Sequence, residues 1–284
     1  MSVKIIECPR DAMQGMDLFI PTEKKAAYIN QLLKVGFDTI DFGSFVSPKA
    51  IPQLRDTAEV LSMLNLENTK SKLLAIVANT RGAQDACNFE EIDYLGYPFS
   101  ISETFQLRNT NATIDQSLSR VEEMQNLCVQ NNKKMVVYIS MAFGNPYGDP
   151  WSGQLAAEWT EKLTKDLGVE IIALADTVGV SNGDNITELF STLIPAFPKV
   201  EIGAHLHTLP EDAKTKAKLT YDSGCRRFDT ALKGYGGCPM TEDDLVGNMA
   251  TELLIDALSG VDQLSIDEKQ FSEAMMLAGS TFPL

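Results

Sequence analysis

Short apolar, β-branched runs alternate with longer amphipathic stretches along the whole of the 284-residue chain. The stretch at 152–167 is the clearest of the amphipathic ones, because its large apolar residues recur at every fourth position: Leu155, Trp159, Leu163 and Leu167. That spacing puts them on one stripe of a helix, with charged residues on the opposite side. Several such stretches end in a glycine just before the next apolar run, as helices commonly do.

The apolar runs predict eight strands, at 2–7, 38–42, 73–77, 93–101, 134–141, 170–175, 200–206 and 226–232. The amphipathic stretches predict helices near 22–35, 51–64, 81–88, 113–131, 152–167, 183–195, 210–223 and 242–258. Eight units of strand followed by helix predict an α/β fold whose parallel sheet closes into a (β/α)8 TIM barrel. We expect residues 1–284 to form a single catalytic barrel domain, with a short helical tail over about 259–284.

An open, doubly wound sheet is the alternative arrangement of the same elements. A glycine-rich, phosphate-binding turn after the first strand would favour it, but residues 8–11 at that position read Cys-Pro-Arg-Asp. We therefore favour the barrel. In such barrels the reacting groups lie at the C-terminal ends of the strands, so we searched those ends for candidate chemistry.

The end of the seventh predicted strand carries GAHLHT at 203–208, which contains both histidines of the chain, His205 and His207. Residues two apart on a strand point to the same face, so the two imidazoles can bind one metal ion. A pair of half-buried strand histidines bonded to the backbone is the alternative interpretation.

Other strand ends add carboxylates and hydroxyls. Arg10 and Asp11 follow the first strand, where Asp11 can be a hard oxygen ligand or part of a surface ion pair. Asp41 interrupts an apolar run in the second strand, and a buried carboxylate needs a partner. Ser44 follows it, and Thr177 follows the sixth strand beside an aspartate that can serve as a helix cap.

The segment after the eighth strand reads KGYGGCPMTEDDLVGN, from 233 to 248. Its glycines predict a mobile loop with Cys238 at the tip, either as a reactive group or as an idle thiol. Asn248 precedes the helical run and can be a metal ligand or an N-cap. Two imidazoles, one carboxylate and one amide oxygen suit Mg²⁺ or Mn²⁺ and leave coordination positions for a chelating substrate.

Composition excludes several classes of partner. A net charge of −15 and a pI near 4.6 argue against binding to nucleic acid or to an anionic membrane surface. The first residues do not resemble a signal region, and no apolar run is long enough to span a membrane. The five cysteines are odd in number and lack C-x-x-C spacing, so we expect free thiols in a cytoplasmic protein.

Taken together, these motifs resemble the 3-hydroxy-3-methylglutaryl-CoA (HMG-CoA) lyase family, among metal-dependent barrels that cleave or form carbon–carbon bonds. The resemblance is carried by ECPRDAMQ at 7–14, SFVSPKAIPQLRDTAEVL at 44–61, SMAFGNPYGD at 140–149, ALADTVGV at 173–180, GAHLHT at 203–208, GYGGCP at 234–239 and GNMATE at 247–252. The Gly-Gly-Cys-Pro loop is typical of the lyases rather than of their condensing relatives.

The resemblance implies a retro-aldol cleavage of HMG-CoA, or of a close 3-hydroxyacyl-CoA, to acetyl-CoA and acetoacetate. It implies a divalent cation, Mg²⁺ or Mn²⁺, an acyl-CoA substrate as in leucine breakdown, and a homodimer. The implied metal ligands are Asp11, His205, His207 and Asn248. The implied catalytic residues are Cys238, Arg10 and Asp11, and the implied substrate contacts are Arg10, Gln14, Asp41, Ser44 and Thr177.

Four features depart from the family pattern. Asp41 stands where the lyases usually have Glu, and Ala12-Met13 stands where they have Gly-Leu after Arg-Asp. Thr208-Leu209 replaces the aspartate that commonly follows the second histidine, and the segment 238–248 is one residue longer. Three alternatives therefore stay open. They are a condensing enzyme that joins acetyl-CoA to a 2-keto acid, a pyruvate aldolase that acts without CoA, and an inactive acyl-CoA-binding protein.

Overall fold

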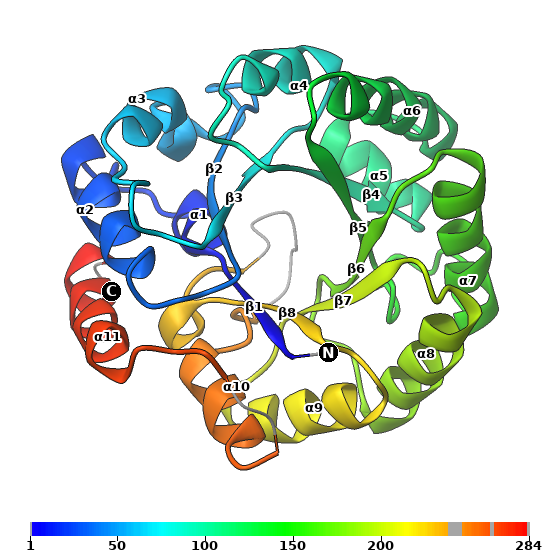
Figure 1. The fold of residues 1–284 in the computed structure, drawn as a ribbon. Helices are drawn as coiled ribbons and strands as arrows, with labels where there is room; N and C mark the ends of the chain where they lie inside the picture. The colour runs from blue at the N-terminus through cyan, green and yellow to red at the C-terminus, as the bar shows by residue number, and fades with distance from the viewer. Residues whose placement is uncertain (1, 238–245, 262–263, 283–284) are drawn as a thin grey trace.

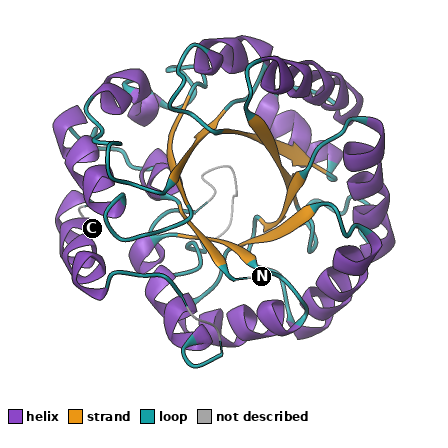
Figure 2. Ribbon diagram, in the orientation of Figure 1, coloured by secondary structure: helices purple, strands orange, loops and turns teal. Residues whose placement is uncertain are grey.

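The eight strands close into a parallel barrel in chain order, β1-β2-β3-β4-β5-β6-β7-β8, and helices surround it (Figure 1). The computed structural model describes residues 2–237, 246–261 and 264–282. Strands line the inside of the ring and helices form its outer layer, as colouring by secondary structure shows in Figure 2. The prediction of a TIM barrel is confirmed, and the open doubly wound sheet is excluded.

The strands are β1 Lys4–Glu7, β2 Thr39–Ser44, β3 Lys72–Ile76, β4 Tyr94–Ser100, β5 Lys134–Ser140, β6 Ile171–Asp176, β7 Glu201–Leu206 and β8 Arg227–Thr230. The helices are α1 Pro9–Gln14, α2 Thr22–Leu32, α3 Thr57–Ser62, α4 Thr80–Cys87, α5 Glu103–Thr110, α6 Ile114–Gln130, α7 Gly153–Glu161, α8 Gly183–Ala196, α9 Pro210–Asp222, α10 Thr251–Leu258 and α11 Glu268–Thr281. Two short 3₁₀ turns, Pro52–Leu54 and Leu232–Gly234, and one π turn, Lys162–Asp166, complete them. Among the described residues, none of these helices combines the length and the apolar character needed to cross a membrane.

Three elements differ from the sequence expectation. The predicted helix at 51–64 is divided into the turn Pro52–Leu54 and α3, because Asp56 between them is not helical. Of the predicted helix at 242–258, residues 242–245 lie outside the described part of the chain and α10 begins only at Thr251. The short helices α1 and α5 follow β1 and β4 and were not predicted.

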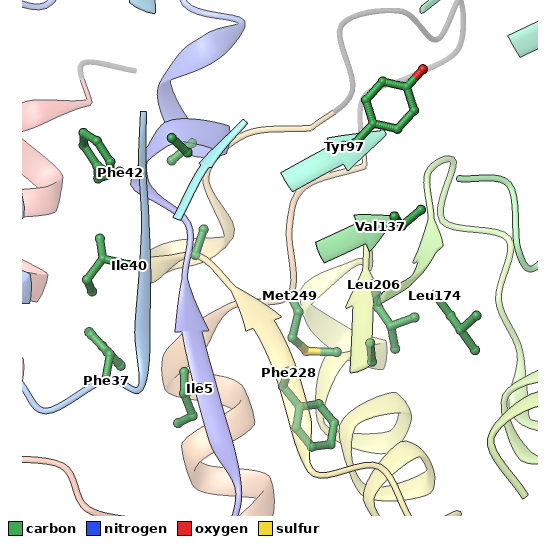
Figure 3. Packing of buried hydrophobic residues seen from close by; sticks show 14 of the residues in the cluster. Ile5, Phe37, Ile40, Phe42, Tyr97, Val137, Leu174, Leu206, Phe228 and Met249 are labelled. Carbon is green, nitrogen blue, oxygen red and sulfur yellow. The ribbon is translucent and has the colours of Figure 1, made fainter. Parts of the chain in front are cut away.

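The strands alternate between two packing layers, as the pleat requires. Ile40 and Phe42 on β2 project to the same side of that strand (Figure 3), and together with Ile5 on β1 and Phe228 on β8 they belong to the large apolar core. The inner face is different. There β3, β5 and β6 form a small apolar cluster of their own, which includes Ile76 and Tyr138. Across the barrel, β2, β7 and β8 contribute Asp41, His205 and Asp229 instead, and all three are buried.

A glycine of the GAHLHT motif makes room for a buried arginine inside the barrel. Arg227 is 1 % exposed and donates from Nη1 to Oε1 of Glu201 at 3.2 Å. A Cβ at Gly203 would lie 2.8 Å from Cδ of Arg227, closer than real Cβ contacts allow. The glycine is therefore required by the side chain on the neighbouring strand.

A buried carboxylate links the first strand to the segment that follows the last. Glu7 accepts the backbone N–H of Leu232 at 2.8 Å and the hydroxyl of Thr251 at 2.6 Å. Burial raises the pKa of Glu7 to about 8, although both hydrogen bonds oppose the increase. These bonds fix the start of α10 against β1 and thereby locate the residues just before α10. At the end of the chain, α11 packs on α2, where the rings of Tyr28 and Phe282 meet edge to face at 5.2 Å.

Candidate active site

Arg10 connects three of the predicted site residues at the mouth of the barrel. Its Nη2 donates to Oδ2 of Asp41 at 2.6 Å, and its Nε donates to the same oxygen at 3.0 Å. Its Nη1 donates to Oδ1 of Asp11 at 2.7 Å and to Oε1 of Gln14 at 2.9 Å. Arg10, Asp11 and Gln14 all lie on α1, which begins with Pro9 directly after β1. The short helix therefore points all three into the mouth.

The charge of Arg10 keeps both neighbouring carboxylates ionised. Burial opposes the ionisation of Asp11, but Arg10 and the nearby His205 outweigh it and hold the pKa of Asp11 well below its usual range. For Asp41, burial is the larger effect and raises the pKa to about 6, while Arg10 limits the increase. Arg10 thus favours the negative form of both side chains, which lie on either side of the guanidinium.

The two histidines lie beside Asp11. His205 is on β7, and its Nε2 lies 3.6 Å from Oδ2 of Asp11. The rings of His205 and His207 are 5.4 Å apart. One ligand atom from each of Asp11, His205 and His207 lies within 4.8 Å of the others, and all three residues are buried. The sequence prediction that these residues converge is confirmed.

Hydrogen bonds orient both imidazole rings. Nδ1 of His205 lies 3.2 Å from Oδ2 of Asp229, and Nδ1 of His207 lies 3.1 Å from the carbonyl oxygen of Val246. A carboxylate and a carbonyl only accept, so each Nδ1 carries a hydrogen, and each Nε2 is the nitrogen at which a metal ion can take the place of a proton. This is the usual arrangement of a metal-binding histidine, whose second nitrogen donates to a carboxylate or a carbonyl.

The electrostatics of the pair favour a positive charge between the carboxylates. Burial alone would lower the pKa of His205, but Asp11 and Asp229 outweigh it and raise that pKa to about 10. His207 shows the opposite shift, because burial and then the charge of His205 lower its pKa to about 4. A single cation, whether a proton or a metal ion, is therefore strongly stabilised where these side chains meet.

Asn248 pairs with His207 through the backbone, and it does not start a helix. It forms an antiparallel bridge with His207 and is 3 % exposed, whereas α10 begins three residues later. The alternative in which Asn248 is an N-cap is therefore wrong. Its Nδ2 donates to the carbonyl oxygen of Tyr235 at 2.8 Å, so Oδ1 is the atom that can ligate a cation.

The glycines before Cys238 are adjacent to this cluster. Gly236 has φ of +94°, and a Cβ there would lie 2.6 Å from the backbone oxygen of Asp11 and 2.7 Å from Nδ2 of Asn248. Only glycine fits such a contact and such a backbone angle. Cys238, for which the family resemblance implies a catalytic role, lies outside the described residues.

The donor atoms at this position fit a divalent cation. Oδ2 of Asp11 is buried without a hydrogen-bond partner, which is costly unless a cation completes its environment. One carboxylate oxygen, two imidazole nitrogens and an amide oxygen suit Mg²⁺ or Mn²⁺. A second group, Cys8 with His205 and Asp229, also lies within 4.8 Å. There, however, Nδ1 of His205 is already bonded to Asp229, and burial raises the pKa of the Cys8 thiol well above its usual range.

Asp11, His205 and His207 line a cavity of about 560 Å³. Gln14 and Thr177 line it as well, and Thr177 accepts the backbone N–H of Met141 at 3.1 Å. Asp41 lies behind Arg10 and is not among the lining residues. Ser44 does not line the cavity either, because its hydroxyl donates to the carbonyl oxygen of Ile76 on the neighbouring strand at 3.1 Å.

Several residues that line this cavity were not predicted from the sequence, among them Tyr138, Arg108 and Arg120. The hydroxyl of Tyr138 is buried without a hydrogen-bond partner, and its ring meets His205 edge to face at 5.5 Å. The sequence does contain a signal for Tyr138. Side chains along β5 alternate between the inside and the outside of the barrel, and Tyr138 is an inward-facing position near the C-terminal end of the strand. Arg108 and Arg120 lie on helices outside the sheet and had no comparable signal.

The fold and the site together define a TIM barrel with a buried cluster, at the C-terminal ends of its strands, that could hold a metal ion. The model of the HMGL-like family matches residues 3–275, and the chain belongs to that family. A cytoplasmic HMG-CoA lyase of Rattus norvegicus is 32 % identical over 262 residues, which cover 91 % of this chain and 75 % of the relative.

Solved structures give the same relationship. An HMG-CoA lyase from Bacillus subtilis superposes with a TM-score of 0.91 at 29 % identity, covering 99 % of this chain and 94 % of that one. An HMG-CoA lyase from Acinetobacter baumannii, solved with coenzyme A and 3-methylmalate, superposes with a TM-score of 0.89 at 30 % identity. The alignment with the second covers 98 % of this chain and 92 % of the other.

The orientation of His205 predicts a role for Asp229 in metal binding. In an Asp229→Asn variant the charge that fixes Nδ1–H is lost, so we expect affinity for Mn²⁺ to fall by roughly ten- to a hundredfold. Calorimetric titration with Mn²⁺ measures this, with circular dichroism to check the fold. Asp56→Asn is the matched control. It breaks a buried ion pair with Lys25 on α2, away from the site, and should leave metal affinity unchanged. Unaltered affinity in Asp229→Asn would contradict the prediction.

Proposed function

We propose that this protein is a divalent-metal-dependent lyase that cleaves HMG-CoA, or a closely related 3-hydroxyacyl-CoA, to acetyl-CoA and acetoacetate or the corresponding keto acid. The observation that carries the proposal is the convergence of Arg10, Asp11, His205 and His207 on one cavity floor, in a chain related to HMG-CoA lyases. An acyl-CoA is then the small-molecule partner. Homodimer formation and a cytoplasmic location stay predictions.

Asp11, His205, His207 and Asn248 would hold the cation, Mg²⁺ or Mn²⁺. When bound, it would supply Lewis-acid chemistry by lowering the pKa of the substrate hydroxyl and polarising the ketone that forms. The buried, partnerless Oδ2 of Asp11 and the two Nε2 atoms support this ligand set. Each of these donors is held in place by a hydrogen bond to the group behind it.

The hydroxyl proton must be accepted by a group on the cavity floor, and Asp11 and His205 are the candidates. His205 cannot accept it while it holds the cation, because Nε2 then binds the metal and Nδ1 carries the hydrogen that it donates to Asp229. A carboxylate keeps further lone pairs when one of its oxygens binds a cation, so we assign the base to Asp11, although Arg10 and His205 lower its pKa.

Arg10 would stabilise the enolate oxygen that develops as the C2–C3 bond breaks. Its orientation is fixed before substrate arrives, because Asp41, Asp11 and Gln14 hold three of its nitrogens. A preorganised donor needs little rearrangement at the moment of reaction, which is the source of its catalytic effect. Asp41 serves here as a positioning residue, since it is buried behind the guanidinium.

Cys238 would protonate C2 of the enolate, giving acetyl-CoA. This assignment rests on the sequence, in which the thiol follows Gly236 and Gly237 directly. The close packing of Gly236 on Asp11 and Asn248 supports it. That contact places the backbone beside the candidate metal ligands two residues before the cysteine. A thiol with a reference pKa of about 8.5 is mostly protonated at neutral pH and can act as the acid.

Turnover of HMG-CoA tests the proposal directly. With Mg²⁺ present, the protein should release acetyl-CoA and acetoacetate, chelation should abolish release, and added Mg²⁺ or Mn²⁺ should restore it. Acyl-CoA analogues and CoA-free hydroxy-keto acids should be assayed in parallel. Cleavage of only the CoA-free compounds would show an aldolase, and full activity in excess chelator would exclude the metal.

Replacing Arg10 separates charge from geometry. Arg10→Lys keeps the charge but loses the planar guanidinium, whose several N–H groups can donate to Asp41 and to the substrate at the same time. We expect kcat to fall by roughly a hundredfold and KM to change much less, because the stabilised charge exists mainly in the transition state. Arg81→Lys, at an exposed position on α4 that does not line the cavity, is the control. An unchanged kcat in Arg10→Lys would limit Arg10 to ground-state binding.

Replacing Cys238 separates proton donation from metal binding. Cys238→Ala should lower turnover by roughly two to four powers of ten, the usual effect of removing a positioned general acid. Its Mn²⁺ affinity should equal that of the wild type, because the thiol is not a ligand in this scheme. Cys87→Ala, on α4, is the matched control and should be fully active. Loss of metal affinity in Cys238→Ala would make the thiol a ligand instead.

A further inference from the structure

The C-terminal helix α11 reaches the segment that precedes Cys238 through one buried ring. α11 lies beside α2 on the outside of the barrel (Figure 1). Phe282, the residue after α11, is 1 % exposed, and its ring lies 5.2 Å from that of Tyr28 on α2. The ring of Tyr235 is also 5.2 Å from it. Phe282 therefore joins an outer helix to the segment that follows β8.

The position of α11 does not depend on Tyr235. Just before the helix, the backbone N–H of Asp267 donates to the carbonyl oxygen of Val35 at 2.9 Å. In its first turn, the ring of Phe271 meets that of Phe37 edge to face at 6.5 Å. The start of α11 is thus fixed to the segment after α2, and the helix carries Phe282 to its place about three turns later.

A second contact joins α11 to the same segment. A Cβ at Gly279, in the last turn of α11, would lie 2.7 Å from Nζ of Lys233, so the ammonium group lies directly against the helix backbone. A positive charge is favourable there, because the carbonyl groups of a helix point toward its C-terminus. The turn Leu232–Gly234 is therefore packed on α11 as well, immediately before Tyr235.

Tyr235 connects these contacts to the candidate metal ligands. Its carbonyl oxygen accepts Nδ2 of Asn248 at 2.8 Å, which leaves Oδ1 of Asn248 as the ligand atom. The next residue, Gly236, packs on the backbone oxygen of Asp11. The ring of Tyr235 thus rests on Phe282 while its backbone rests on the ligand set. A shift of the ring would also move the carbonyl, because both belong to one residue.

We propose that Phe282 is a positioning residue for the cation site, an inference that rests on the proposed function, in which Asn248 is a ligand. By holding the Tyr235 ring against α11, Phe282 keeps the Tyr235 carbonyl where it orients the Asn248 amide. Groups behind a metal ligand fix its orientation, and their loss typically lowers metal affinity by about ten- to a hundredfold. Phe282 does not line the cavity, so its effect on the site is transmitted through Tyr235.

Calorimetric titration with Mn²⁺ tests this role. We expect the affinity of Phe282→Ala to be roughly tenfold lower, at the lower end of the usual range because the Tyr235 carbonyl is displaced but not removed. Phe271→Ala is the matched control. It removes a ring from the same helix that contacts Phe37 and not Tyr235, and it should bind Mn²⁺ as the wild type does. Thermal unfolding records the loss of stability in each variant separately from affinity.

Hydrogen exchange followed by mass spectrometry gives a readout without metal. The backbone N–H groups of residues 232–235 all donate hydrogen bonds, so their exchange reports opening of this segment. Exchange there should be faster in Phe282→Ala and unchanged in Phe271→Ala. Phe282→Leu keeps an apolar side chain against both tyrosines, so it should show the same pattern with a smaller loss of affinity. It replaces Phe282→Ala in the test if the alanine variant does not fold.

Two results would overturn the inference. One is an unchanged Mn²⁺ affinity in the folded Phe282 variant, even with faster exchange. The other is an equal loss of affinity in Phe271→Ala, which would mean that any loosening of α11 weakens the site. Because affinity is measured without turnover, the proposed function fails separately. A wild type whose Mn²⁺ affinity depends on Phe282 but that cleaves no acyl-CoA would refute the lyase alone. A wild type that binds no Mn²⁺ would refute both.

Discussion

Two carboxylates are buried at the mouth of this barrel, and the guanidinium of Arg10 between them is what makes their burial possible. Asp11 and Asp41 are 4 % and 0 % exposed, and an unpaired charge at either position would be strongly destabilising. Arg10 bonds to both, with distances of 2.7 and 2.6 Å. Because one oxygen of Asp11 is fixed by this bond, the other is directed toward His205. The position of the candidate metal ligand thus follows from charge balance rather than from packing.

The need to pair each buried charge with one of opposite sign also applies deeper inside the barrel, where positive and negative side chains alternate. His205 lies between Asp11 and Asp229, at 3.6 and 3.2 Å. Asp229 in turn faces Nε of Arg227 at 4.0 Å, and Arg227 pairs with Glu201 near the opposite end of the strands. Each buried charge is thus adjacent to one of opposite sign, which is how a largely polar half of the barrel interior remains compatible with folding. The apolar half, around Tyr138 and Ile76, forms the other wall.

Much of this arrangement could be predicted from the sequence, because it depends on regular features. The alternation of strands and helices gave the barrel, and the rule that reacting groups follow the strands brought Asp11, His205 and His207 together. The short helices α1 and α5 could not be predicted, because six and eight residues are too few to show helical periodicity. The N-cap alternative for Asn248 stayed open in the sequence because a β-bridge to His207, over forty positions away, leaves no local signal.

Arg108 and Arg120 were missed for a related reason. They look like ordinary solvated helix residues in the sequence, and only the tertiary structure brings them to the cavity that Arg10 lines. The SMAFGNPYGD motif was recognisable as part of the family resemblance, but the bond of its Asp149 to α5 depends on the folded loop. Motifs therefore identified the end of the cavity near Arg10, whereas the end lined by Arg108 and Arg120 required the structure.

The central claim is that a divalent cation binds to the Nε2 side of His205, together with Asp11 and His207. A crystal soaked in Mn²⁺ and measured at a wavelength where manganese scatters anomalously tests it most directly. We predict one strong anomalous peak within coordination distance of Oδ2 of Asp11 and of Nε2 of both histidines. A peak on the Nδ1 side of His205, between Cys8 and Asp229, or no peak in the barrel at saturating Mn²⁺, would contradict the account.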